Sequence, residues 1–128
     1  MSDIDNFMQT EFLSFYQRVL AAFEKNHAAL FTAYRHLVPA KLRFGMRLVD
    51  NATVLGDYTL ELDNGKIRSI ENGVLAAELH TPFGIVKPYY IIEKSTVEKM
   101  IQDEQAFISH PFATKFKYLP EVTIKFQK

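Results

Sequence analysis

Residues 42–67, LRFGMRLVDNATVLGDYTLELDNGKI, decide the fold because apolar and polar residues alternate along two runs within them. The apolar members of the two runs are Leu42, Phe44, Met46 and Leu48, followed by Tyr58, Leu60 and Leu62. A period of two is that of an extended strand with one buried and one exposed face. The two runs therefore predict two strands that contribute to one broad apolar sheet face.

Two Asn-Gly pairs predict where this sheet turns. Asn64-Gly65 suits the two positive φ angles of a type I′ turn, which predicts a tight hairpin over Asp63–Lys66. Asn72-Gly73 is a second turn signal of the same kind, and we expect the next strand over Val74–Leu79. The sheet is therefore expected to be mainly antiparallel.

Helical spacing dominates the sequence before this sheet. Ser2 suits an N-cap, and apolar residues then recur every three or four positions, which predicts an amphipathic helix ending near Lys25-Asn26. A second, shorter helix is expected over 30–38, where Pro39 ends it by disfavouring helical geometry at the residue before. Two helices are thus available to cover the apolar sheet face.

The boundaries of the remaining elements are predicted from proline, glycine and serine residues. We expect a loop at His80–Gly84 and an apolar strand at Ile85–Glu93, although Pro88 disfavours a central position for that strand. Ser95 and Glu98 match a capping box that opens a helix, which His110-Pro111 would stop. Alternation over 122–126 predicts a last strand.

The predicted fold class is α+β, with N-terminal helices packed on a curved, mainly antiparallel sheet of about five or six strands and a further helix before the last strand. The length of 128 residues matches a single domain, 1–128. No stretch approaches the about 20 apolar residues of a membrane span, and no secretory signal opens the chain, which favours a cytoplasmic protein.

Charge and cysteine content exclude several kinds of site. Fifteen basic and fifteen acidic residues balance, which argues against nucleic acid as a partner. The chain has no cysteine, which excludes thiol catalysis, disulfides and cysteine-ligated metals. Basic residues do gather at Lys41, Arg43 and Arg47 and again over 115–128; a solvated sheet face explains them, and transient contact with an anionic membrane surface is an alternative.

Catalytic and cofactor motifs are absent from the sequence. His27, His36, His80 and His110 have no metal-ligand spacing, and neither a nucleophile elbow nor a phosphate-binding glycine loop occurs. Glu78 would be a candidate general base if it were buried, but the favoured interpretation is that it faces water. We therefore expect no cofactor and no metal, and a binding protein rather than an enzyme.

What covers the apolar sheet face then decides the function. Helices that fill the space make it ordinary core, whereas helices that stand off leave a pocket for a hydrophobic small molecule or lipid. Eleven Phe and four Met in one small domain favour an adaptable apolar pocket. The predicted ligand-binding residues are Phe44, Met46, Tyr58, Leu60, Phe83, Tyr89, Phe107 and Phe112.

The chain resembles the sterol carrier protein (lipid-transfer) family from Lys41 to the helix after Ser95. The residues that carry the resemblance are the Leu42-Arg43-Phe44 strand, the hairpin over 58–66 and the segment 91–101 that enters a helix. The resemblance implies an α+β fold that encloses a tunnel for fatty acyl chains or sterols, without a metal or redox cofactor. The glycine-rich ending of that family is not seen after Ile108, and residues 80–87 look inserted.

Two other function classes stay open at this point. A cone-shaped α+β barrel of the ketosteroid-isomerase type would also start with helices and wrap a sheet around an apolar pocket, and some members of that superfamily are enzymes. A pocketless interaction module would instead use the first helix to form a homodimer through Phe12, Tyr16 and Phe23. A carboxylate or histidine inside a pocket would favour the first class, and a stable dimer the second.

Overall fold

A long N-terminal helix opens the structure. In the computed structural model, which describes residues 2–127, it comprises α1 (Asp3–Phe7), the π-helical turn η1 (Met8–Phe12) and α2 (Leu13–Asn26). The predicted cap is confirmed, since the hydroxyl of Ser2 accepts a hydrogen bond of 3.1 Å from the amide of Asp5. At His27 the chain leaves helical geometry, and α3 (Ala28–Leu37) follows and ends before Pro39, as predicted.

The sheet has the strand order β3-β2-β1-β5-β4, and β6 pairs with the other edge of β5. Its strands are β1 (Lys41–Asp50), β2 (Thr53–Asp63), β3 (Lys66–Asn72), β4 (Leu79–Thr81), β5 (Gly84–Glu93) and β6 (Thr123–Gln127). All pairs are antiparallel except the central one, in which β1 runs parallel to β5. The predicted α+β class is therefore confirmed, with a parallel pair at the middle of the sheet.

The predicted hairpin between β2 and β3 is confirmed. Asn64 and Gly65 have φ angles of 52° and 81°, the two positive values that a type I′ turn requires. Gly65 is buried, and a Cβ built on it would lie 2.7 Å from Cε1 of Tyr34 in α3. The hairpin turn thus packs directly on α3, and glycine is needed there for both conformation and space.

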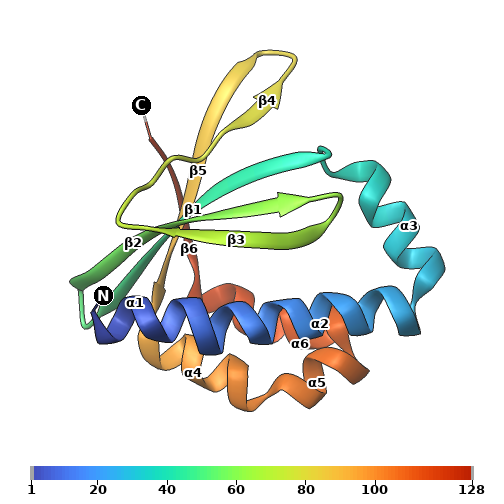
Figure 1. Cartoon of the computed structure of the whole chain (residues 1–128), viewed down its shortest axis with the longest axis horizontal. Helices are drawn as coiled ribbons and strands as arrows, with labels where there is room; N and C mark the ends of the chain where they lie inside the picture. The colour runs from blue at the N-terminus through green and yellow to red at the C-terminus, as the bar shows by residue number, and fades with distance from the viewer. Residues whose placement is uncertain (1, 128) are drawn as a thin grey trace.

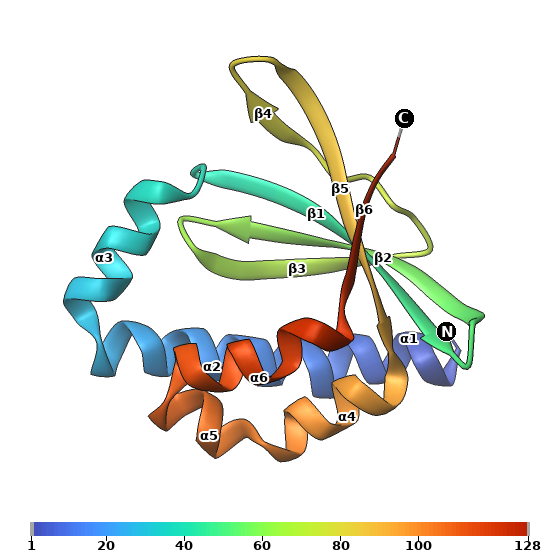
Figure 2. The same cartoon turned by 180° about the vertical axis from the view of Figure 1, so that it is seen from behind.

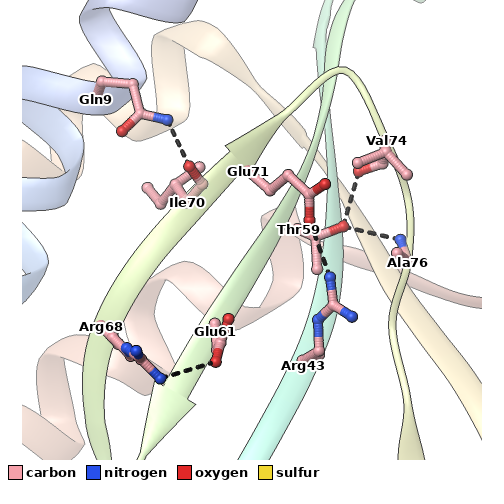
Figure 3. Close-up of polar contacts among 9 residues, drawn as sticks. All are labelled: Gln9, Arg43, Thr59, Glu61, Arg68, Ile70, Glu71, Val74 and Ala76. Atoms are coloured by element: carbon pink, nitrogen blue, oxygen red, sulfur yellow. Dashed lines mark hydrogen bonds and ion pairs between the residues drawn. The ribbon is translucent and has the colours of Figure 1, made fainter.

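The strand predicted over Val74–Leu79 is wrong for Val74–Ala77, which cross the face of the sheet opposite the long helix as an irregular segment. Thr59 fixes this segment: its hydroxyl donates to the carbonyl of Val74 and accepts from the amide of Ala76, each at 2.8 Å (Figure 3). A side-chain hydroxyl therefore satisfies backbone groups that a strand would have paired in a ladder. At Asn72-Gly73 only the glycine has a positive φ, and the predicted second tight turn does not form.

The loop predicted at His80–Gly84 is shorter than expected, because Leu79–Thr81 form β4 and pair with Gly84–Val86 of β5. Figures 1 and 2 show this β4–β5 hairpin projecting from the body of the molecule. Beyond it β5 is central, lying between β1 and β6, although Pro88 disfavoured that position. On the edge of β5 that faces β4 and β1, Pro88 falls after the last residue paired with β4, Val86, and before the first paired with β1, Tyr89; on the other edge it lies opposite Phe126 of β6.

Three helices and a short turn follow β5: α4 (Lys94–Gln102), α5 (Glu104–Ser109), α6 (Pro111–Tyr118) and the 3-10 turn η2 (Leu119–Glu121). The predicted capping box is wrong, since α4 begins one residue before Ser95 and Glu93 occupies the cap position without a capping bond. Pro111 ends α5 as expected but also starts α6, which the sequence analysis missed. Proline suits the first helical turn because no partner is lost there.

The helices form one layer against the sheet. The long N-terminal helix lies across the sheet, and the C-terminal helices α4, α5 and α6 lie beside this helix. The helix α3 stands at the C-terminal end of α2 (Figures 1 and 2). Buried residues of the helices and the sheet form one core cluster, whose large members include Met8, Phe12, Phe15, Leu60, Phe107 and Tyr118. Among the described residues 2–127, no helix is long and apolar enough to cross a membrane.

A bidentate ion pair joins α2 to α5 and makes stability sensitive to acid. Arg18 donates to both carboxylate oxygens of Glu104, with the shortest contact at 2.7 Å, and this lowers the pKa of Glu104. Such a carboxylate stabilises the fold fully above its unfolded pKa, and the contribution is lost as pH falls through the lower folded value. We therefore expect the urea midpoint of unfolding to fall as the pH is lowered from about 5 to about 3.

The variant Glu104→Gln tests this linkage. At pH 7 it should unfold at lower urea concentration than the wild type, and the difference between the two should shrink toward pH 3. Glu11→Gln is the matched control, because Glu11 is exposed and has no ion pair within residues 2–127. A difference that stays constant with pH would show that the charge of Glu104 does not matter.

Candidate functional site

The helices cover only one part of the apolar sheet face. Over Met46, Tyr58 and Leu60 they fill the space completely, and these side chains are 0–1 % exposed. Leu42 and Phe44, nearer the start of β1, are only half-buried. The sequence left two outcomes open, filled core or open pocket, and the structure has both, one at each end of the same face.

The open end forms an apolar groove of about 390 Å³. Its walls come from the end of α3, the start of β1, both strands of the β4–β5 hairpin and β6, and its lining residues are Leu37, Val38, Pro39, Leu42, Phe44, Leu79, Pro88, Tyr89, Tyr90 and Ile124. The groove is open to solvent: Leu37 is 85 % and Ile124 60 % exposed. Burial of these side chains by a ligand would be favourable.

Local sequence explains why α3 does not close the groove. Phe31 and Tyr34 fix α3, the first by burial in a cluster of aromatic rings and the second by its contact with Gly65. One turn later Pro39 ends the helix, and Val38 takes an extended conformation that leads into β1. Leu37 is thereby left at the edge of the groove, where most of its side chain is exposed.

Register places the floor of the groove on one face of the sheet. Tyr90 lies opposite Met46 in β1 and opposite Ile124 in β6, and directly paired residues project to the same face. The rings of Phe44 and Tyr90 lie with centroids 5.4 Å apart. The floor is therefore continuous with the buried core under the helices.

Tyr90 of this floor interacts with Tyr16 of α2, and Tyr16 interacts in turn with Tyr34 of α3. Burial raises the pKa of Tyr16, Tyr34 and Tyr90, and the interaction between the first two, as well as that between Tyr16 and Tyr90, adds to the effect. All three phenols therefore stay protonated at neutral pH and can donate hydrogen bonds. Among residues 2–127, no charged side chain lines the groove.

The eight predicted ligand-binding residues fall into three groups. Those that line the groove are Phe44 and Tyr89. Those buried in the core are Met46, Tyr58, Leu60 and Phe107. Those exposed elsewhere are Phe83, at the tip of the β4–β5 hairpin, and Phe112, on α6. The structure therefore brings two of the eight together at the groove.

Several groove residues were missed by the sequence analysis, above all Leu37, Pro88 and Ile124. Ile124 carried a signal, because it is one of the apolar members of an alternating strand and so had to project to one sheet face. Leu37 carried none, since an apolar residue in the last turn of a helix is usually buried. Where α3 stands relative to the sheet is a tertiary fact that periodicity does not encode.

The groups considered for acid–base chemistry lie outside the groove. Glu78 is exposed, as the favoured interpretation had it, and its carboxylate lies 3.7 Å from Nε2 of His80. His80 and His110 are exposed as well. Within residues 2–127 no group of three or more His, Cys, Asp or Glu side chains is arranged to hold a metal ion.

A larger surface hollow of about 630 Å³ lies between the N-terminal helix and α4, but its chemistry differs. Its lining includes Glu11, Arg18 and Glu98, and Arg18 is already paired with Glu104. Small-molecule sites are mostly apolar with few polar groups, whereas charged side chains make up much of this lining. The apolar groove is therefore the better candidate despite its smaller volume.

The first helix does not present the face that was predicted for dimerisation. Phe12 is buried in the core of its own chain, while Tyr16 and Phe23 are half-buried. Phe23 is further engaged by the rings of Phe31, Tyr34 and Phe112. The side chains that a dimer would have used are thus occupied within one chain.

Comparison of the chain with family models, with curated proteins and with solved structures finds no match. The resemblance to the sterol carrier protein family therefore stays a prediction.

Proposed function

We propose that the protein binds a hydrophobic small molecule, such as a fatty acyl chain or a sterol-like lipid, in the apolar groove. The observation that supports this is the open half of the sheet face, where Leu42, Phe44 and Tyr90 remain accessible beside an already filled core. A volume of about 390 Å³ lies within the range of about 300–1,000 Å³ typical of small-molecule sites.

The expected affinity follows from the apolar lining. Each methylene of a ligand that leaves water contributes about 0.8 kcal/mol, so ten buried methylenes offer about 8 kcal/mol, which corresponds to micromolar binding. The conformational entropy lost by a flexible chain on binding reduces this free energy, and a rigid ring system would lose less entropy.

Displacement of a fluorescent fatty acid from delipidated protein tests the proposal, together with native mass spectrometry of protein purified from cells. Ile124→Asp places a carboxylate on the wall of the groove and should weaken binding by about tenfold or more, because the ligand must desolvate that charge. Ile124 is 60 % exposed, so that the fold should tolerate the change.

Val54→Asp is the matched control, since Val54 is 51 % exposed in β2 and does not line the groove. It should bind the probe as the wild type does. The proposal fails if the wild type shows neither saturable displacement nor a co-purifying lipid, or if Ile124→Asp binds as tightly as Val54→Asp.

A further inference from the structure

The tip of the β4–β5 hairpin carries the most exposed large apolar side chain described in the structure. Phe83 is 99 % exposed, and Ile85 beside it is 55 % exposed. The turn is built to hold this position: the hydroxyl of Thr81 donates to the carbonyl of Gly84 at 2.7 Å and accepts from the amide of Phe83 at 3.2 Å. The phenyl ring is thus presented to solvent by an ordered turn.

Basic side chains outnumber acidic ones around this hairpin, where the carboxylate of Glu78, directly before β4, lies 3.7 Å from Nε2 of His80. Residues 79–90 and 122–127, which form the hairpin and its neighbour β6, contain no aspartate or glutamate. Lys87 and Lys125 lie on adjacent strands, and Lys41 stands at the start of β1. None of these three lysines has an ion pair within residues 2–127, whereas Arg43, Arg47 and Lys117 each pair with a carboxylate.

The shape of the feature limits what can receive it. Figures 1 and 2 show the hairpin as a projection from the body of the molecule, and its tip is convex. A single phenyl ring on a convex tip can be buried either in a complementary pocket or in a soft apolar phase. Lysines without an ion pair in the described part of the chain, Lys87 further along β5 and Lys125 on β6, add attraction to a surface that carries many negative charges, which is the character of an anionic bilayer.

We propose that the β4–β5 hairpin docks the protein on the surface of an anionic lipid bilayer, with Phe83 inserted at the level of the headgroups and lysines, Lys87 foremost, facing the phosphates. Leu79 and Pro88, at the base of the same hairpin, line the apolar groove. Docking would therefore set one wall of the groove close to the membrane. The docking itself does not depend on the groove binding a ligand.

The absence of tryptophan from the sequence provides a direct probe. In Phe83→Trp the new indole reports its own surroundings, and its emission should shift to shorter wavelength when phosphatidylcholine vesicles containing phosphatidylglycerol are added. Val54→Trp, at an exposed apolar position elsewhere in the sheet, should show no shift. A shift of equal size in both variants, or in neither, would overturn the proposal.

Co-sedimentation with vesicles tests the energetics without a new chromophore. Phe83→Ser should lower partitioning onto anionic vesicles by about tenfold, and Val54→Ser should leave it unchanged. The double variant Lys87→Gln, Lys125→Gln should bind more weakly and lose less of its binding when salt is raised, because exposed charges are screened. All of these positions are exposed, and the variants are expected to fold.

Three results would overturn the proposal: no partitioning of the wild type onto anionic vesicles, equal partitioning onto pure phosphatidylcholine, or wild-type partitioning of Phe83→Ser. Displacement of the fluorescent fatty acid from Phe83→Ser should match the wild type, since Phe83 does not line the groove. Groove binding and membrane docking can thus fail separately.

Discussion

Replacing Leu60 with alanine should lower the free energy of unfolding by about 2–5 kcal/mol, because the tightly packed helices and strands around it cannot collapse fully into the space that is left. Leu60 is fully buried between its strand neighbours and the N-terminal helix. Truncating it removes apolar contacts and leaves a cavity in the filled half of the sheet face. Urea unfolding followed by circular dichroism measures the effect.

Ile124→Ala is the matched control at the open half of the same face. Its side chain is 60 % exposed, so truncation should change stability by no more than about 0.5 kcal/mol. If the two variants lost similar amounts of stability, the groove would be closed in solution. In the fatty-acid displacement assay the order should be the opposite: substitution of Ile124 should weaken ligand binding more than substitution of Leu60.

Gly65→Ala should destabilise the protein by about 2–4 kcal/mol, since two separate penalties fall on one residue. An L-residue held at a positive φ costs roughly 1–2 kcal/mol. The added methyl group would also lie 2.7 Å from a ring carbon of Tyr34, and the turn or α3 must then move. Thermal or urea unfolding gives the combined effect.

Gly73→Ala separates the two penalties. Gly73 has nearly the same φ, 84° against 81°, but nothing lies within 4 Å of the methyl group that alanine would add. It should therefore show the backbone cost alone. If both variants lost the same free energy of unfolding, the hairpin and α3 would be able to move apart at no cost to accommodate the methyl group.

The elements that could be predicted from sequence are those with local causes. Alternation over 42–48 and 58–62 fixes two strands, because a period of two leaves one way to bury the apolar set. Asn64-Gly65 predicts the hairpin to the next strand, β3, by its turn geometry. Ser2 marks the beginning of the N-terminal helices and Pro39 their end. Each of these signals lies within a few residues of its effect.

The wrong or missed elements depend on partners distant in sequence. Val74–Ala77 looks like strand sequence, but the hydroxyl of Thr59 competes with a ladder for its backbone groups. Pro111 signals both the end of one helix and the beginning of another, and only its surroundings decide between them. The groove depends on the angle at which α3 leaves the sheet, which no local pattern contains.

The parallel pair at the centre of the sheet has a consequence for how the chain folds. Gly45 and Tyr89 face each other there, although a hairpin, a crossing segment and β4 separate them in sequence. Closing so long a loop costs chain entropy before any contact repays it, and non-local pairing of this kind slows folding. The β1–β2–β3 meander needs short loops only and can form earlier. The open groove, whose walls include β5 and β6, would then be one of the last parts of the molecule to take shape.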